Sequence, residues 1–250
     1  LYYVPYVNQI RYYLAFPFFL LSIHYFIQKR NLFLFILFTF LAVTSHSAIT
    51  LLYSFIPMYY FFSTKSFFKV TFLASGVAFL IVMVLFQLGI AQEIEHFGEY
   101  FTKGMTSSVA GGMFNALPYF IYIIYLWLID RRYRKNNPDY INDKTYSLLS
   151  KFSFFSIIFI PASFFVQVLG HRYVFPFLIV WMIFFLYIIR NESPKRKFFS
   201  FLIAGIVHLI VGFSIYILPL YIFGESSFEE ELIKSTKSIQ YIDFLDMFRN

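Results

Sequence analysis

The residues of this sequence best suited to chemistry are two arginines and a histidine that border long apolar runs. Arg11 precedes the apolar run 12–27, and His46 follows the run 32–43. At about 1.5 Å per residue, each run covers most of a hydrocarbon core about 30 Å thick when it is tilted or the bilayer is locally thinned. A chain that crosses through the first run and returns through the second places a fixed cation and an imidazole on the same side, near the lipid headgroups.

The second arginine, Arg172, lies at the outer end of a later apolar run, between His171 and Tyr173. Each arginine by itself can be explained as a membrane anchor, because its long side chain places the charge in the headgroup region. Two guanidinium groups on one side could instead clamp a diphosphate, because their planar donors pair with phosphate oxygens. His46 could take a proton from a sugar hydroxyl, or hydrogen-bond a substrate without titrating. His171 competes for the same roles.

Three carboxylates, Glu93, Glu95 and Glu99, lie in the polar stretch 92–115. If this stretch is helical, Glu95 and Glu99 share one face. A solvated face and a role as general base or as acceptor for a sugar hydroxyl are both open. The first half of the stretch is expected to form an amphipathic or short helix, and the glycine pair 111–112 indicates a mobile second half. The sequence has no metal-ligand spacing, no nucleotide-binding loop and no Ser/His/Asp arrangement.

The elements that must position these residues are predicted to be membrane-spanning helices. The 250 residues are 60% hydrophobic and 24% aromatic, and only 13% are charged, which is unlike a soluble domain. Apolar runs recur without the ten-residue alternation of a membrane barrel. We expect residues 1–250 to form one all-α domain, a polytopic transmembrane helical bundle of about eight spans. Cysteine is absent, which excludes disulfides, thiolate chemistry and cysteine metal sites.

The net charge of +7 is distributed in a way that favours membrane anchoring over nucleic-acid binding. Most lysines and arginines lie in four clusters, each after one outgoing and one returning run: 29–30, 65–69, 131–151 and 190–197. This is the positive-inside pattern, which places these clusters in the cytoplasm. The same orientation puts residue 1 outside, so we expect the full protein to contain earlier spans.

Short motifs at the positions described above resemble those of a known family. These are Asn8-Gln9-Ile10-Arg11, Ala42-x3-His46-Ser47-Ala48 and His171-Arg172-Tyr173. They are similar to motifs of EpsG-type membrane proteins, which belong among the Wzy-like polymerases of bacterial exopolysaccharide, capsule and O-antigen. The resemblance covers most of the chain. The usual pattern has glutamine or a similar polar residue after the arginine, whereas Tyr12 follows Arg11 here.

The resemblance implies a metal-independent glycosyltransferase of GT-C-like architecture at the outer face of the cytoplasmic membrane. Its partners would be an undecaprenyl-diphosphate-linked glycan donor and acceptor, the bilayer, and chain-length regulator and flippase proteins, without a cofactor or nucleic acid. The acceptor hydroxyl would attack the donor, and undecaprenyl diphosphate would leave. The expected catalytic residues are His46, Arg11 and Arg172. The residues expected to bind substrate are His171, Tyr173, Glu95 and Glu99.

Two other functions stay open at the level of sequence. A flippase or transporter of the same lipid-linked glycan would need a cationic cavity at mid-membrane, and no predicted span carries arginine or lysine at its centre. A membrane acyltransferase would use histidine and arginines in a different spacing, with a cytoplasmic acyl donor. In a deletion strain, accumulated single-repeat glycolipid indicates a polymerase. Loss of all outer glycan indicates a flippase, and normal polymer lacking a substituent indicates an acyltransferase.

The basic clusters generate a prediction about topology. Single cysteines at 131–135 should resist an impermeant thiol reagent in intact cells, whereas cysteines in 92–115 should react, because the Lys/Arg bias sets the orientation. The native chain contains no cysteine, so each variant reports on one position. Labelling of 131–135 in intact cells would reverse the orientation.

Overall fold

The computed structural model describes residues 3–88, 109–165, 170 and 172–213, and the described part is helical, without strands. The α-helices are α1 (Tyr3–His24), α2 (Leu32–Ser45), α3 (Phe55–Phe61), α4 (Thr64–Gln87), α7 (Val109–Asn136), α8 (Lys144–Phe155), α9 (Ile160–Phe165), α11 (Phe177–Ile189) and α12 (Pro194–Gly212). Helices of other types are the π-helix η1 (Tyr25–Lys29) and the 3₁₀ helices η2 (Ser47–Ser54), η3 (Pro138–Asn142) and η4 (Ser156–Phe159).

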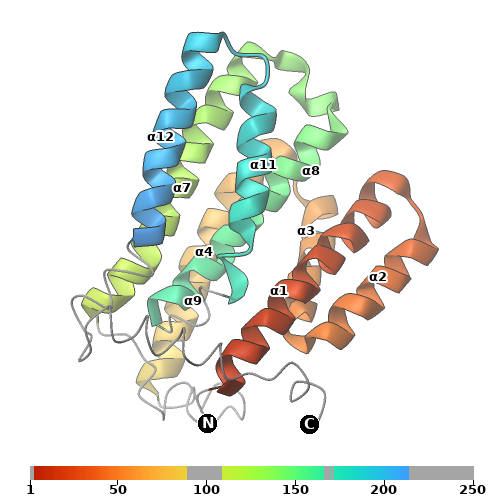
Figure 1. Cartoon of the computed structure of the whole chain (residues 1–250), viewed down its shortest axis with the longest axis vertical. Helices are drawn as coiled ribbons and strands as arrows, with labels where there is room; N and C mark the ends of the chain where they lie inside the picture. The colour runs from red at the N-terminus through yellow and green to blue at the C-terminus, as the bar shows by residue number, and fades with distance from the viewer. Residues whose placement is uncertain (1–2, 89–108, 166–169, 171, 214–250) are drawn as a thin grey trace, which may run out of the picture.

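The helices form an elongated bundle beside a tilted hairpin (Figure 1). The hairpin consists of α1 and α2, which pack along each other. In the bundle, α4 contacts α8, η4 and α9, while α7 contacts α9, α11 and α12. The turn of the hairpin is tied to the start of α8, because the Gln28 side-chain amide donates a hydrogen bond to the Lys144 carbonyl (3.0 Å). Two chain segments predicted to be cytoplasmic therefore lie at the same end.

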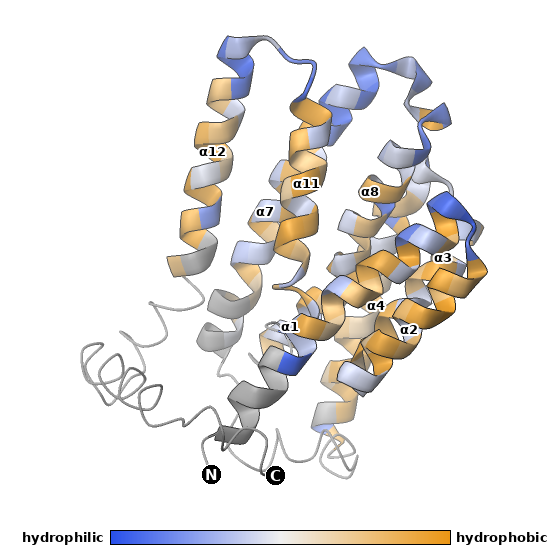
Figure 2. Cartoon of the chain, turned by 45° about the vertical axis from the view of Figure 1, so that its right-hand side comes forward, coloured by the Kyte–Doolittle hydropathy of each residue, from blue (hydrophilic) through white to orange (hydrophobic). Residues whose placement is uncertain are grey.

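The exposed surface of the bundle is apolar along most of the length of its helices. Figure 2 shows hydrophilic residues gathered at the end that holds the start of α12 and the hairpin turn, while the helix bodies are hydrophobic. Two helical segments, Thr64–Leu85 and Lys144–Phe165, are long and apolar enough to cross a membrane, and three shorter ones are also apolar. The all-α prediction is confirmed for the described residues. The count of eight spans and the GT-C-like architecture stay predictions.

The segment after His46 is a 3₁₀ helix with a buried face that repeats every three residues. Ile49, Leu52 and Phe55 are each 0% exposed, as expected when 3.0 residues make one turn and positions i and i+3 eclipse. At about 2.0 Å per 3₁₀ residue and about 1.5 Å per α residue, η2 and α3 together extend about 26 Å. The apolar run 48–62, which is long enough to be predicted as a further span, thus gains length from its 3₁₀ half.

The apolar run 148–169 is predicted to span the membrane, and its proline predicts a kink. At Pro161 this kink takes the form of a change of helix type. The α-helix α8 gives way to η4 over Ser156–Phe159 before α9 begins at Ile160. Proline has no N–H to donate to the preceding turn, and its ring crowds the carbonyl four residues earlier. Trp181 of α11 stabilises the change, because its Nε1–H donates to the Ser153 carbonyl (3.1 Å) and the Ser156 hydroxyl (3.0 Å).

The prediction of a mobile second half of the stretch 92–115 is wrong for residues 109–115. These residues form the first turns of α7, which runs through the glycine pair. A Cβ on Gly112 would lie 2.4 Å from the Phe164 carbonyl oxygen. The glycine therefore serves the close approach of α7 to α9, and not a turn. Residues 92–108 lie outside the described part of the chain.

The hydrophilic composition of residues 130–146 predicts a loop that only connects two spans, but this stretch contains a buried polar network. Asp130 is 0% exposed, accepts a hydrogen bond from the Tyr146 hydroxyl and pairs with Arg134 Nη2 (3.0 Å). Burial raises the pKa of Asp130 to about 6, although Arg134 and the hydrogen bond from Tyr146 lower it. This network joins the end of α7, which extends to Asn136, to the start of α8.

The close approach of α7 and α9 predicts that Gly112→Ala destabilises the protein. Because the new methyl group meets a backbone oxygen that no rotamer change can move, the helices must separate, at a cost of about 1–3 kcal/mol. Gly205→Ala in α12 is the matched control, since nothing lies within 4 Å of a Cβ at Gly205. Thermal unfolding in detergent should show a lower Tm for Gly112→Ala alone. Equal Tm values would contradict this account of the glycine.

Candidate functional site

Three distant chain segments meet at the ring of Tyr12. The Tyr12 ring lies edge-on to His46 (5.3 Å between centroids, 81°) and to Tyr173 (5.8 Å, 75°). Tyr12 is 1% exposed, and its hydroxyl has no hydrogen-bond partner within the described part of the chain. Its neighbours in sequence and space include Arg11 and Arg172. The middle of α1, the junction of α2 with η2 and the segment before α11 thus form one polar cluster.

The backbone at His46 determines what its imidazole can do. His46 is extended (φ −159°, ψ 116°) between α2 and η2, and its N–H donates to the Ala42 carbonyl (3.0 Å). The Ala48 N–H in turn donates to His46 Nδ1 (3.2 Å). A neutral imidazole whose Nδ1 accepts carries its proton on Nε2. The free nitrogen of His46 is therefore a hydrogen-bond donor.

The surroundings of His46 favour the neutral imidazole. His46 lies between two predicted spans, where burial lowers its pKa and the charges of Arg172 and Arg11 lower the pKa further. With a pKa below the ordinary value of about 6.5, the ring is neutral at physiological pH. Of the two roles open at the level of sequence, a neutral hydrogen-bond donor fits this geometry better than a general base.

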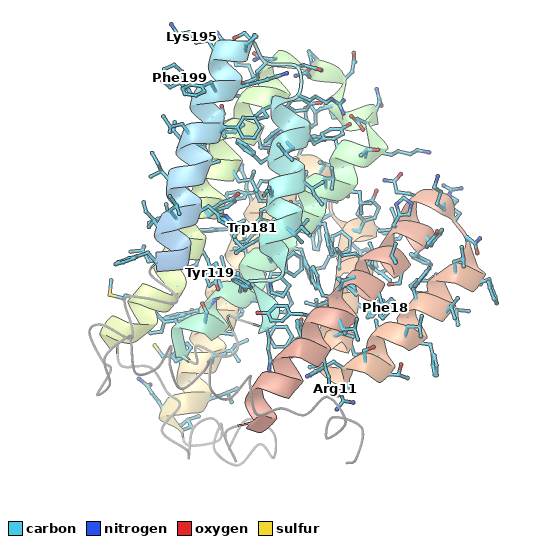
Figure 3. All side chains as sticks on the ribbon, viewed as in Figure 1. Arg11, Phe18, Tyr119, Trp181, Lys195 and Phe199 are labelled. Carbon is cyan, nitrogen blue, oxygen red and sulfur yellow. The ribbon has the colours of Figure 1, made fainter. Side chains whose placement is uncertain are left out.

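The two arginines reach the cluster from different sides. Arg11 is exposed, and Figure 3 shows it near the end of α1 remote from Lys195 of α12. Arg172 is half-buried in a short helical turn, in which the N–H groups of Val174 and Phe175 donate to the Gly170 carbonyl (2.9 and 3.0 Å). Lys195 belongs to a predicted cytoplasmic cluster, so the two arginines lie toward the end predicted to be outside.

Tyr173 connects the cluster to the interior of the bundle. Its ring contacts Tyr12 and also stacks on Phe159 of η4 (5.5 Å, 20°). The 3₁₀ turn before Pro161 thus supports the position of Tyr173. The cluster depends on two interruptions of regular α-helix, one after α2 and one before α9.

The structure brings together four of the predicted site residues, namely Arg11, His46, Arg172 and Tyr173. The predictions for His171, Glu95 and Glu99 lie outside the described residues. Tyr12 was not predicted as a site residue, although its place after Arg11, where the family pattern has a polar residue, was the available signal. Among the described residues, no three His, Asp or Glu side chains gather as a metal site requires.

The fold and this site define an all-helical membrane protein with a cationic, tyrosine-lined cluster toward one end of its bundle. The model of the EpsG family matches residues 1–231, and the chain belongs to this family. The resemblance noted in the motifs is thereby confirmed. The family places the protein in polysaccharide biosynthesis at a membrane. No curated protein and no solved structure matches the chain.

The geometry of His46 predicts that a side-chain amide can replace the imidazole. His46→Gln keeps an N–H donor, so activity should fall by less than about tenfold. His46→Ala removes the donor and should lower activity about ten- to hundredfold, the value of one hydrogen bond to a charged group. The measurement is the initial rate of glycan transfer at matched expression.

The dependence on pH separates the donor from a general base. Since the neutral ring is the populated form above its lowered pKa, the wild-type rate should not change with the titration of His46 between about pH 7 and 8. His46→Gln should show the same profile there. An acid limb in the wild type that His46→Gln abolishes would instead identify His46 as a general base.

Proposed function

We infer that this protein is a polymerase of a bacterial surface polysaccharide. It joins oligosaccharide repeat units carried on undecaprenyl diphosphate, at the outer face of the cytoplasmic membrane. Membership of the EpsG family supports the polysaccharide substrate and the membrane. The observation that carries the proposal is the convergence of Arg11 and Arg172 on one neutral imidazole beside a buried tyrosine. The basic clusters predict that this cluster faces outward.

The proposed reaction is the transfer of a glycan from one lipid carrier to another. The acceptor hydroxyl oxygen forms a bond to the anomeric carbon of the donor, and the bond from that carbon to the diphosphate oxygen breaks. The electron pair of the broken bond leaves with undecaprenyl diphosphate, and the hydroxyl proton passes to a base. The charge that develops on the leaving diphosphate is the main requirement for stabilisation.

The residues of the cluster suit this requirement. Arg11 and Arg172 supply planar pairs of N–H donors that match diphosphate oxygens. His46 adds a neutral donor from Nε2 without the charge repulsion of an imidazolium beside two guanidiniums. The Tyr12 hydroxyl is buried and has no partner within the described part of the chain, so it can donate to a sugar hydroxyl or a phosphate oxygen once substrate binding opens the cluster. Tyr173, which the sequence predicts to bind substrate, is half-buried beside Tyr12 and completes the cluster.

The flippase alternative receives less support from the structure. A transported diphosphate needs a cation free at mid-membrane. Lys151 is a buried cation within the predicted span 148–169, but its Nζ donates to the Tyr59 carbonyl (2.7 Å) and lies 4.4 Å from the centroid of the Tyr59 ring. The Tyr59 carbonyl lies in the last turn of α3, where the helix itself supplies no donor, and Lys151 of α8 donates to it. Lys151 is accordingly a structural cation.

The proposed function predicts that lysine cannot replace Arg172. An ammonium keeps the charge but loses the paired planar donors. Losing one charge-assisted hydrogen bond in the transition state should slow polymer formation about ten- to hundredfold. Arg172→Ala should be worse, and Arg11→Lys should resemble Arg172→Lys. If the two arginines act as a pair, the double variant should lose less than the sum. The readout is polymer length and amount, together with the lipid-linked single repeat unit.

Arg131→Lys provides the matched control, because Arg131 is an exposed arginine at the predicted cytoplasmic end. It should make normal polymer at normal expression. Accumulation of single-repeat glycolipid in Arg172→Lys supports the polymerase. Long polymer at near-normal levels from Arg172→Lys would leave Arg172 an interfacial anchor and remove the clamp.

A further inference from the structure

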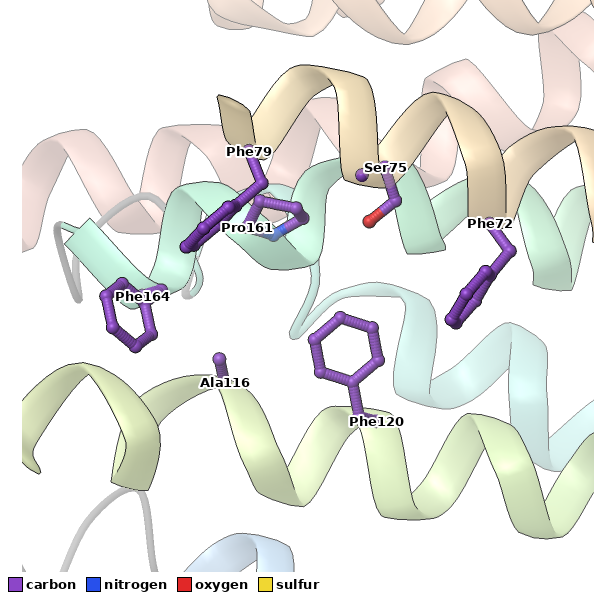
Figure 4. Close-up of a pocket in the computed structure, with 8 residues that line it drawn as sticks. Phe72, Ser75, Phe79, Ala116, Phe120, Pro161 and Phe164 are labelled. Atoms are coloured by element: carbon purple, nitrogen blue, oxygen red, sulfur yellow. The ribbon is translucent and has the colours of Figure 1, made fainter. Parts of the chain in front are cut away.

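An apolar cavity of about 260 Å³ lies between α4, α7 and α9. Figure 4 shows aromatic rings on its walls from all three helices. The walls include Phe72, Gly76 and Phe79 of α4, Phe120 of α7, and Pro161 and Phe164 of α9. Engineered apolar cavities of about 150 Å³ hold benzene. This cavity therefore accepts a larger apolar group, at least one five-carbon isoprene unit.

The cavity is open at the side of the bundle. Phe72 is 51% exposed, and Gly76 is exposed as well. A Cβ built on Gly76 meets nothing within 4 Å. The absence of a side chain at Gly76 leaves this part of the wall empty, so a chain in the surrounding hydrocarbon can enter without moving a helix.

One short segment connects the cavity to the cationic cluster. Phe159 of η4 stacks on Tyr173 of the cluster. Pro161, two residues further along the chain, lines the cavity. The close packing of Gly112 on Phe164 holds α7 against α9 and thereby fixes a second wall. Residues 159–161 therefore link the cluster to the cavity within one turn of the chain.

We propose that this cavity binds the isoprenoid chain of the lipid-linked substrate whose diphosphate lies at Arg11 and Arg172. The identity of the lipid rests on the proposed function. A phospholipid acyl chain would fill the same space with no connection to the cluster, whereas a polyprenyl diphosphate spans both. Methyl-branched, unsaturated units pack against the four phenylalanine rings by dispersion contacts. Binding orients the anomeric carbon at the cluster, because the two ends of the carrier are then both held.

The expected loss of affinity depends on the medium from which the isoprenoid chain enters the cavity. The chain moves into the cavity from lipid and not from water, so there is little hydrophobic gain and packing supplies the affinity. Filling the cavity should therefore weaken binding moderately. For Gly76→Leu we expect an increase in Kd of about three- to tenfold, and for Gly76→Ala a smaller one in the same direction.

The test measures binding of undecaprenyl phosphate to the protein in nanodiscs of phosphatidylcholine, to which phosphatidylglycerol is added as a competitor. Gly205→Leu is the matched control, because Gly205 is also an exposed helical glycine with nothing within 4 Å of its Cβ. We expect weaker binding in Gly76→Leu, unchanged binding in Gly205→Leu, and no displacement by excess phosphatidylglycerol. The thermal midpoint of each variant confirms its folding. Should Gly76→Leu fail to fold, Gly76→Ala decides the outcome.

Wild-type affinity in both Gly76 variants would overturn the proposal. Displacement of undecaprenyl phosphate by an equal amount of phosphatidylglycerol would also overturn it, in favour of a groove for bulk lipid. The assay requires no turnover, so its result is separable from the proposed reaction. Normal polymer from Arg172→Lys would contradict the diphosphate clamp of the proposed function. The effect of Gly76→Leu on binding would still test the cavity.

Discussion

In a helical chain whose exposed faces are apolar, each buried polar group must find its partner inside the fold. Two buried serines do so within their own helices: the Ser22 and Ser163 hydroxyls donate to carbonyls three residues earlier (2.7 and 2.6 Å). Trp181 and Lys151 do so across helices, at carbonyls near the change of helix type in η4 and near the end of α3. These two contacts between helices lie where regular helix stops, and they hold the interruptions in place.

The candidate site uses the same interruptions for a different purpose. At the end of α2 the backbone becomes extended, and the Ala48 N–H occupies one nitrogen of His46. Near the start of α11, a short turn carries Arg172 and Tyr173 to the same place. Tyr12 contacts both segments, but the described part of the chain offers its hydroxyl no partner. A buried polar group without a hydrogen-bond partner destabilises the folded state, and a ligand that supplies the partner removes this cost.

The convergence of Arg11 and His46 could be predicted, because the lengths of two apolar runs determine which ends of the hairpin meet. The break near Pro161 could also be predicted, since proline cannot continue the hydrogen-bond pattern. The structural role of Gly112 could not be predicted, because composition does not distinguish a glycine that permits a turn from one that permits close packing. The proton position on His46 was equally inaccessible, since it depends on a backbone N–H two residues away. The burial of Asp130 and Lys151 depends on neighbours remote in sequence.

The 3₁₀ geometry of η2 limits how this protein can be stabilised for study. Substituting strong α-helix formers is a common route to higher stability. Across the eight residues of η2, conversion to α-helix would shorten the segment by about 4 Å. It would also turn Ile49, Leu52 and Phe55 out of line by about 60° per step, since three residues cover about 300° of an α-helix. Substitutions in η2 that are selected by helix propensity alone would therefore lose buried packing and move His46 relative to Arg172, so stabilising changes belong in the regular α-helices.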